Sequence, residues 1–262
     1  MNINFKQDYP IIIGLAGKAG SGKTSVAEYM VPKGSIETTL HGMKWDHIFY
    51  ALPLYEMASI KRSIRGFNQE SRQLFAIHEV LYDIYGRSPI GTMPDYNTFV
   101  SKVKDIYNLP IEEEGIKPRS FLQKAGDVCR DGYEDCFSSW AITKSIRLYN
   151  SYKKNLNEEI DDELPFVVFI SDVRFVNEAQ KILDQPNGVL ICFDANEDTL
   201  NDRILKRDGK LMNSDQKNHI SEQQIEVIKS MATHVIKTDN MSIEEQAQAT
   251  LKELGILKES HA

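Results

Sequence analysis

The fold is decided by residues 11–24, which read IIIGLAGKAGSGKT. The first six of these residues are apolar or glycine, and such an uninterrupted run is typical of a strand that is buried on both faces of a parallel sheet. The remaining eight match the pattern G-x-x-x-x-G-K-[ST], and the helix-compatible residues 24–31 follow directly. A strand, a glycine-rich turn and a helix in this order predict a phosphate-binding loop, or P-loop, in an α/β protein.

The chemistry of such a loop suits a nucleoside triphosphate with magnesium. Glycines let the backbone turn tightly, so that successive N–H groups point at phosphate oxygens beside the positive end of a helix. Lys23 would bridge the β- and γ-phosphates, and the Thr24 hydroxyl would bind Mg²⁺. A glycine-rich turn that matches by chance is the alternative, and the flanking strand and helix argue against it. We therefore expect ATP and Mg²⁺ as cofactors, with the ATP site formed by Gly17, Ala19, Gly20, Ser21, Gly22, Lys23, Thr24 and Ser25.

Apolar segments and helical patterns alternate along much of the chain. Strands are expected at 11–16, near 47–50, and at 166–170, 189–193 and 234–237, with helices at 24–31, 175–184, 197–208 and 243–254. This alternation predicts an α/β fold with a mostly parallel five-stranded sheet flanked by helices. Residues 56–163 depart from it and predict a largely helical insertion between the second and third strands. The chain would then be a single domain with its core at about 8–55 and 164–258.

Composition and charge exclude several classes of partner. A net charge of −7 argues against tight, sequence-independent binding to DNA or RNA, which requires clustered Lys and Arg. The cysteines at 129, 136 and 192 lack C-x-x-C spacing and favour reduced thiols in a cytosolic setting. Residues 1–10 do not read as a signal peptide, and no stretch approaches the roughly 18 apolar residues that cross a membrane. We expect a soluble, cytoplasmic protein whose partners are small nucleotides, with homodimer formation left open.

The end of the strand at 166–170 narrows the kind of nucleotide chemistry. The strand runs into Ser171-Asp172-Val173-Arg174, and ligands of open α/β sheets bind at the carboxyl ends of strands. An acid paired with an arginine suits phosphate acceptance better than water activation. The sequence contains no N-K-x-D guanine motif, and this strand lacks the Asp-Glu ending that is usual in motor ATPases. These features favour a small-molecule kinase over a GTPase or a motor.

Two further groups of polar residues are candidates for binding phosphate or base. Arg203 and Arg207 lie four residues apart on one face of a predicted helix, where they could close over a triphosphate. A solvated basic helix end is the alternative. Arg119, Gln123 and Arg130 would share a face if their helix is continuous, offering an amide to a base edge and guanidinium groups to a phosphate. An exposed polar face is the alternative there.

These blocks resemble the deoxynucleoside monophosphate kinases of tailed bacteriophages, which belong to the P-loop nucleoside monophosphate kinases. The more specific blocks are R-x-x-L-Q-x-x-G-D-x-x-R at 119–130, followed by Trp140, and S-D-V-R-F-x-N-E-A at 171–179. Y-A-L-P-L at 50–54 and H-I-S-E at 219–222 resemble two shorter elements of the family. The resemblance covers most of the chain in scattered blocks.

The resemblance implies a P-loop kinase fold and transfer of the γ-phosphoryl group of ATP to a deoxynucleoside 5′-monophosphate, for DNA precursor synthesis in the host cytoplasm. Catalytic residues would be Lys23, Arg174, Arg203 and Arg207. The acceptor would be surrounded by Arg119, Gln123, Gly126, Asp127, Arg130, Trp140 and Asp172, and magnesium would be bound by Thr24 and Asp172. Leu52 and Tyr55 stand where the family often has Asp and Lys, and no threonine separates Gly126 from the acid. The preferred base is therefore not inherited from relatives.

Three other functions compete with this one. Residues 203–209 also resemble the lid of dephospho-coenzyme A kinase, so the acceptor could be another small molecule. A nucleotide-dependent switch or DNA-handling ATPase would hydrolyse ATP without a small acceptor. A nucleotide-binding structural module without catalysis is disfavoured, because Lys23, Thr24, Asp172 and Arg174 are all present.

Overall fold

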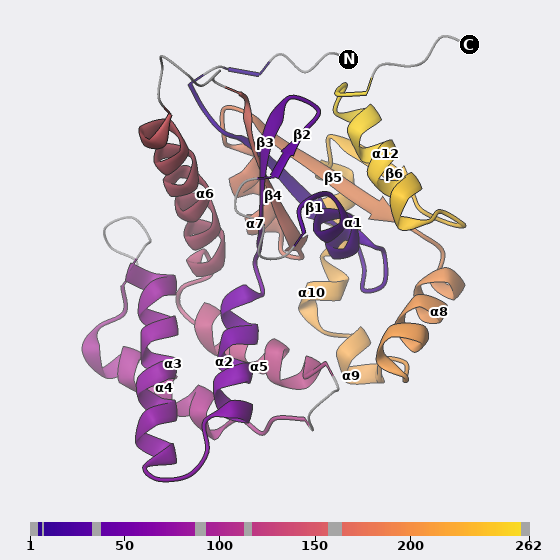
Figure 1. Ribbon diagram of the computed structural model, residues 1–262. Helices are drawn as coiled ribbons and strands as arrows, with labels where there is room; N and C mark the ends of the chain where they lie inside the picture. The colour runs from indigo at the N-terminus through magenta and orange to yellow at the C-terminus, as the bar shows by residue number, and fades with distance from the viewer. Residues whose placement is uncertain are drawn as a thin grey trace. The chain divides into compact units, whose positions relative to one another are not determined.

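The structure is a computed structural model that describes residues 5, 6, 8–32, 38–86, 93–112, 117–156 and 164–257. The chain divides into two compact units (Figure 1). The sheet unit comprises Met1–Phe49, Lys144–Leu211 and Ile220–Ala262, and the helical unit comprises Tyr50–Thr143 and Met212–His219. The boundary between them falls within helix α6 (Cys136–Asn155). No helix in the described part of the chain combines the length and the apolar character that crossing a membrane requires.

The sheet unit is built on a mostly parallel sheet with the strand order β2-β3-β4-β1-β5-β6. Its strands are β1 (Ile11–Ala16), β2 (Thr38–Leu40), β3 (Met43–Phe49), β4 (Phe166–Val173), β5 (Gly188–Asp194) and β6 (His234–Lys237). All neighbours pair in parallel except β2 and β3, which are antiparallel. The mixed α/β architecture and the parallel sheet agree with the prediction, and the arrangement is consistent with a P-loop α/β fold.

The predicted strand count of five was wrong, because the described residues form a six-stranded sheet. The additional strand is β2, which has three residues and pairs with β3 across a two-residue turn. Both turn residues, His41 and Gly42, have positive φ, of 51° and 70°, as expected for a turn whose twist matches that of a β-hairpin. A strand this short carries too few residues for an alternation pattern.

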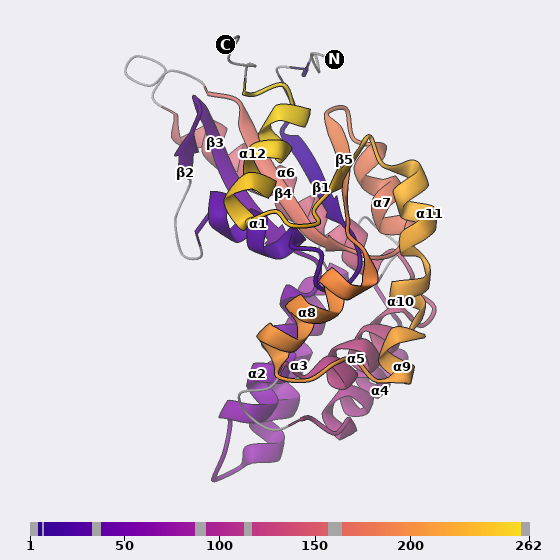
Figure 2. The same cartoon turned by 90° about the vertical axis from the view of Figure 1, so that its right-hand side faces the viewer.

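Helices cover both faces of the sheet. One face packs against α1 (Lys23–Met30) and α12 (Ile243–Glu253), which lie side by side in Figures 1 and 2. The other face packs against α7 (Val176–Leu183) and α11 (Ile225–Met231). With a helix layer on each side, every residue of β1 is buried. The uninterrupted apolar run of β1 therefore reflects this two-sided burial.

The core between the sheet and α1/α12 draws alternate residues from each strand, because successive side chains of a strand point to opposite faces. Burial of each large aliphatic side chain contributes about 1.5–3 kcal/mol. The main members of this cluster are Ile11, Ile13, Leu15, Val26, Ala27, Trp45, Val167, Phe169, Val189, Ile191, Phe193, Ile236, Ala247 and Leu251.

Capping residues set the ends of the flanking helices. Ser242 and Glu245 form a reciprocal capping box at the start of α12, with N···O distances of 3.2 and 2.7 Å. Asn196 caps α8 (Glu197–Asp208) through the Thr199 N–H, and Gly209 ends the helix at φ 71°. These helices, with α1 and α7, lie within two residues of their predicted bounds, so those predictions are confirmed. The short helix α10 (Ile220–Gln223) precedes α11.

The helical unit contains α2 (Leu52–Ser63), α3 (Gln69–Gly86), α4 (Tyr96–Asn108), α5 (Arg119–Arg130), the first part of α6, and α9 (Ser214–Lys217). The described residues between β3 and β4 thus form helices, as predicted for this part of the chain. Two lysines, the partly buried Lys61 and the buried Lys102, brace the unit by donating to backbone carbonyls near helix ends. Lys61 donates to Tyr107 and Leu109, and Lys102 donates to Val128 and Asp131. Such carbonyls would otherwise lack a partner within their own helix.

Candidate functional site

The loop between β1 and α1 has the conformation that its glycines allow. Gly17 and Gly22 have φ of 140° and 99°, values that residues with a side chain rarely adopt. A Cβ at Gly17 would lie 2.5 Å from the carbonyl oxygen of Phe193, and one at Gly22 would lie 2.2 Å from the Gln246 side chain. Both fixed glycines of the motif are therefore required by the fold. Because Gly22 caps α1 without a side chain to accept a hydrogen bond, the first N–H groups of α1 suit an anion.

Lys23 is the first residue of α1 and is buried at the mouth of the loop. Its side chain is 5% exposed, and its Nζ lies 3.4 Å from Asp172 Oδ1 and 3.3 Å from the Lys18 carbonyl oxygen. Burial, reinforced by the nearby Arg174, lowers the pKa of Lys23 to about 8, although Asp172 and Glu222 oppose that shift. A polyanion that enters this loop would therefore meet a cation already removed from water.

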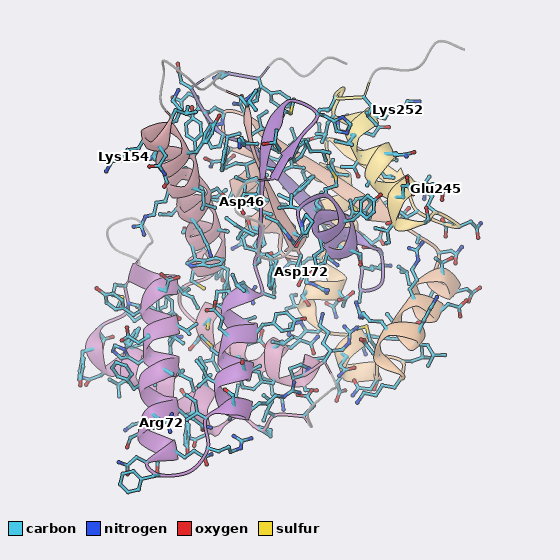
Figure 3. The ribbon with its side chains drawn as sticks, viewed as in Figure 1. Asp46, Arg72, Lys154, Asp172, Glu245 and Lys252 are labelled. Carbon is cyan, nitrogen blue, oxygen red and sulfur yellow. The ribbon has the colours of Figure 1, made fainter. Side chains whose placement is uncertain are left out.

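Asp172 is aimed at Lys23 by an irregularity in β4. Leu15 pairs with Ser171 and Ala16 pairs with Val173, so Asp172 is an extra residue in the ladder. Its φ of 68° is left-handed, as in a β-bulge that redirects a side chain. Figure 3 labels Asp172 at this end of β4. The strained backbone brings its carboxylate within 2.7 Å of Arg174 Nε.

Arg174 joins Asp172 to a second carboxylate. Its Nη1 pairs with Glu222 Oε1, and Glu222 Oε2 accepts the Ala19 N–H of the P-loop at 3.2 Å. Burial disfavours the charge on Arg174, but Asp172 and Glu222 outweigh it and raise the pKa of the guanidinium. For Glu222, burial is likewise outweighed, chiefly by Arg174 and Lys23, and its pKa is lowered. Arg174 and Glu222 are thus held in their charged forms at neutral pH, and Lys23 is mostly charged below its pKa of about 8.

The backbone at Arg174 is fixed by a neighbouring acid. Glu178 Oε2 accepts the N–H groups of Arg174 and Phe175 at 2.9 and 3.2 Å, at the start of α7. Glu178, which belongs to the block at 171–179, therefore fixes the backbone at the end of β4. Lys23, Asp172 and Arg174 come together as a constellation, and Glu222 is a fourth member.

Arg203 and Arg207 have different surroundings although they were predicted to share a face. Arg203 donates to the Thr238 carbonyl oxygen at 2.6 Å and to the Gly20 carbonyl oxygen at 3.5 Å. Arg207 forms a bidentate pair with the adjacent Asp208 at 2.8 and 2.9 Å, with its side chain about half exposed. In this structure Arg203 braces the back of the P-loop, and Arg207 lies at the surface. Their action as lid residues stays a prediction.

The two residues predicted to bind magnesium, Thr24 and Asp172, are connected through Lys23. Thr24 lies in the first turn of α1, directly after the lysine that contacts Asp172. Among the residues that the structure describes, no three His, Cys, Asp or Glu side chains cluster as a metal site. Mg²⁺ that serves phosphoryl transfer commonly uses one or two protein groups together with phosphate oxygens and water. Thr24 and Asp172 as its ligands stay a prediction.

The predicted acceptor residues lie in the helical unit. Helix α5 runs unbroken through Gly126, so Arg119, Gln123 and Arg130 do belong to one helix. A Cβ at Gly126 would lie 2.8 Å from Arg130 Nη1, so this glycine makes room for the guanidinium, which sits 4.6 Å from the centre of the Phe137 ring. These contacts position Arg130 without testing its role.

The remaining acceptor candidates contact other parts of the helical unit. Gln123 Nε2 donates to the Gln216 carbonyl oxygen at 3.4 Å, and Asp127 Oδ2 lies 3.3 Å from His219 Nε2. Trp140 is 1% exposed and donates from Nε1 to Asp83 at 2.8 Å. Its burial favours a structural role, because a ligand would reach the ring only if the core opened.

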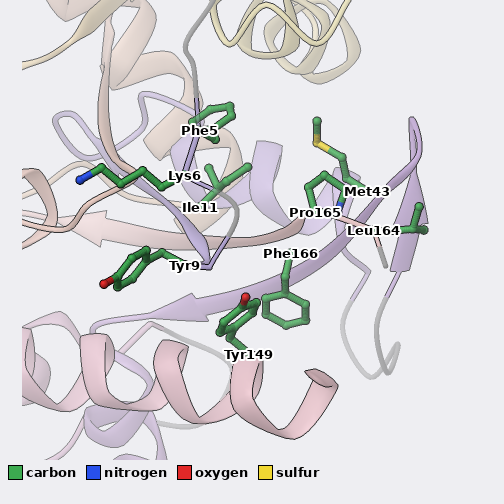
Figure 4. Close-up of a pocket in the computed structure, with 9 residues that line it drawn as sticks. All are labelled: Phe5, Lys6, Tyr9, Ile11, Met43, Tyr149, Leu164, Pro165 and Phe166. Atoms are coloured by element: carbon green, nitrogen blue, oxygen red, sulfur yellow. The ribbon is translucent and has the colours of Figure 1, made fainter. Parts of the chain in front are cut away.

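A cavity of about 180 Å³ lies elsewhere in the sheet unit (Figure 4). It adjoins Ile11 and Phe166, the first residues of the parallel strands β1 and β4. The P-loop follows the other end of β1, six residues away, or roughly 20 Å at 3.3 Å per residue. The cavity is therefore separate from the loop between β1 and α1. Its lining is Phe5, Lys6, Tyr9, Ile11, Met43, Tyr149, Leu164, Pro165 and Phe166.

Comparisons with known proteins leave the family open. No model of a known protein family matches the chain, and no curated protein matches it. Among solved structures, TT1252 from Thermus thermophilus matches with 18% identity and a TM-score of 0.40, covering 94% of this chain and 98% of that chain. A sugar kinase from Janibacter sp. HTCC2649 matches with 12% identity and a TM-score of 0.38, covering 95% of this chain and 96% of that chain. A protein from Eubacterium ventriosum matches with 15% identity and a TM-score of 0.33, covering 95% and 99%. Likenesses this weak carry no argument about function.

Proposed function

We propose that this protein is an ATP-dependent kinase that transfers the γ-phosphoryl group to a deoxynucleoside 5′-monophosphate, releasing the diphosphate and ADP. The observation that carries the proposal is the charge cluster beside the P-loop, in which the buried Lys23 contacts Asp172 and Asp172 contacts Arg174, both of these being 16–17% exposed. Phosphoryl transfer needs little covalent chemistry from a protein and depends on positioning and on stabilising charge. A buried lysine and arginine next to a phosphate loop suit that requirement.

The donor half of the reaction rests on the P-loop. The amides of the loop and of the first turn of α1 would hold the phosphate oxygens of ATP, and Lys23 would neutralise the β- and γ-phosphates. A bound Mg²⁺ would offset further negative charge, with Thr24 and Asp172 as its proposed protein ligands. The polyanion favours the charged form of Lys23, so the lowered pKa of the empty site would rise on binding.

The acceptor half rests on the resemblance of α5 to the phage kinases. Arg119 and Arg130 would bind the phosphate of the monophosphate, because guanidinium groups match phosphate oxygens in a bidentate way. Gln123 would contact the base, since an amide offers both a donor and an acceptor to a base edge. Arg174 would act on the transferred group, where its charge stabilises the transition state.

The proposal is tested by following ADP release from ATP and Mg²⁺ with a panel of acceptors. The panel contains the deoxy- and ribonucleoside monophosphates and dephospho-coenzyme A. We expect at least one deoxynucleoside monophosphate to raise ADP release far above ATP hydrolysis alone, with the matching diphosphate as product. Hydrolysis that is indifferent to every acceptor would instead identify an ATPase or a switch, and preference for dephospho-coenzyme A would identify the rival kinase.

Two lysine variants show whether the P-loop is responsible. Lys23→Ala should lower transfer at least about 100-fold, the scale for removing one charge-stabilising group in a transition state. The matched control is Lys252→Ala, because Lys252 is exposed on α12 in the same unit (Figure 3). Circular dichroism would establish that both variants are folded. Near-normal transfer by Lys23→Ala would overturn the proposed function.

A further inference from the structure

Glu222 occupies the P-loop in a way that an anionic ligand would. Its carboxylate is 10% exposed and has two partners, the Ala19 N–H through Oε2 and the Arg174 guanidinium through Oε1. A backbone N–H of a P-loop and an arginine are also the two kinds of donor that bind a terminal phosphate. The carboxylate therefore supplies, from within the chain, the negative charge that a phosphate oxygen would bring.

The position of Glu222 is fixed by the segment that carries it. Gln224 Oε1 accepts the Val176 N–H at 2.7 Å, which ties the segment to the start of α7. Ile225 and Ile228 are buried, and Ser221 is 5% exposed. Packing on both sides of Glu222 shows that its contact with the loop is part of the fold of the sheet unit.

We propose that Glu222 is an internal substitute for the γ-phosphate, which a triphosphate must displace and which thereby lowers the preference of the site for ATP over ADP. The inference rests on the proposed binding of ATP by the P-loop. In the empty site Glu222 and Asp172 together balance the charges of Lys23 and Arg174, and without Glu222 one positive charge would lack a carboxylate. Displacement by the γ-phosphate releases Arg174 to act on the transferred group. Glu222 is accordingly a positioning residue for Arg174 and a determinant of nucleotide specificity.

A diphosphate would disturb this arrangement less than a triphosphate. ADP lacks the phosphate that competes with the carboxylate for Arg174 and the Ala19 N–H, so it can bind while Glu222 stays in place. ATP must either displace Glu222 or bind beside a second negative charge, and like charges brought together in an interface are costly. Removal of the charge should therefore favour ATP selectively.

The test compares Glu222→Gln with wild type and with Glu226→Gln. Glu226 is a matched control, because it pairs with Lys18 of the same loop at 3.1 Å, but its side chain is 63% exposed. Dissociation constants for ADP and for a non-hydrolysable ATP analogue are measured by calorimetry with Mg²⁺. We expect the ratio Kd(ADP)/Kd(ATP analogue) to rise about tenfold in Glu222→Gln and to stay within twofold of wild type in Glu226→Gln. An unchanged or lower ratio in Glu222→Gln would overturn the inference.

Hydrogen exchange of the wild-type protein provides a test that needs no variant to fold. Displacement of Glu222 should loosen α10, so amides of residues 220–223 should exchange faster with the ATP analogue than with ADP. Equal exchange, or stronger protection with the ATP analogue, counts against the inference. Its failure is distinguishable from failure of the proposed function. If Glu222→Gln shifts the Kd ratio but the wild type transfers phosphate to no acceptor, the inference holds and the proposed function fails. If the wild type transfers phosphate but the ratio is unshifted, the proposed function holds and the inference fails.

Discussion

Replacing Lys23 with methionine should stabilise the empty protein at neutral pH while it abolishes nucleotide binding. Burial lowers the pKa of Lys23 from 10.5 to about 8, and one pKa unit corresponds to 1.36 kcal/mol. Holding the lysine charged in the fold therefore costs on the order of 3 kcal/mol, after the attraction of Asp172 and Glu222 is included. Methionine has a similar length and carries no charge, so Lys23→Met removes this cost.

The pH dependence follows from the direction of the shift. Below about pH 8 the folded and unfolded chains both carry the Lys23 proton, and the full cost is present. Between about pH 8 and 10.5 the folded chain loses the proton while the unfolded chain keeps it, so the wild type becomes more stable relative to the variant. The advantage of Lys23→Met should be largest at pH 7 and should vanish above pH 10.5.

Urea unfolding at pH 7, 8.5 and 10 measures this difference. Trp45 is buried in the sheet unit and is one of two tryptophans, so a Trp140→Phe background makes its fluorescence report that unit. Lys252→Met on the surface of α12 is the control, and should change the free energy of unfolding by less than about 0.5 kcal/mol at each pH. ATP at 100 times its Kd should add about 2.7 kcal/mol to the wild type and nothing to Lys23→Met. The reasoning would be refuted if Lys23→Met were less stable than wild type at pH 7. It would also be refuted if the free energies of unfolding of the two proteins differed by the same amount at all three pH values.

Two further comparisons test how the site is supported. Asp172→Gly and Asp172→Ala remove the same carboxylate, but only alanine is strained at φ 68°. The free energy of unfolding should therefore be about 1 kcal/mol higher for the glycine variant than for the alanine variant. Equal stability in urea would mean that the bulge is not strained. Arg203→Met should lower the free energy of unfolding by about 1–2 kcal/mol and weaken ATP binding, because the hydrogen bonds of Arg203 to Thr238 and Gly20 hold the loop. Arg207→Met should lower the free energy of unfolding by less than about 0.5 kcal/mol, since the Arg207 side chain is half exposed. Equal losses of stability for the two arginine variants in calorimetry would contradict this.

The parts of the fold that could be predicted from the sequence are those written in consecutive residues. The strand at 11–16, the loop after it and the helix at 243–254 each depend on a local pattern, and the structure confirms all three. Strand β2 could not be predicted, because three residues are too few to show the alternation of apolar and polar side chains that indicates a strand. It is recognised only by its hydrogen-bonded pairing with β3. The short signal that existed was His41-Gly42, a pair able to adopt positive φ.

The site required information that lies far apart in the chain. Glu222 is 48 residues from Arg174 and 203 residues from Ala19, so no spacing rule relates it to either. Its only signal was the H-I-S-E block at 219–222, which resembled a family element without an assigned role. The bulge at Asp172 is likewise invisible in sequence, because the extra residue is defined by the register of β1. Helical spacing placed Arg203 and Arg207 together, but packing decided that only one of them braces the loop.

Backbone strain and buried charge distinguish the residues of the candidate site from those that stabilise the fold. Lys23 is buried with a lowered pKa, Asp172 has a left-handed backbone, and Glu222 places a carboxylate on a loop shaped for phosphate. The first two arrangements are unfavourable by themselves, and buried ion pairs such as that of Glu222 with Arg174 are seldom retained for stability. Trp140, in contrast, donates to Asp83 and fills a core. Because strain and buried charge persist where preorganisation requires them, their convergence beside the P-loop supports the proposed phosphate chemistry more directly than any single residue of the motif.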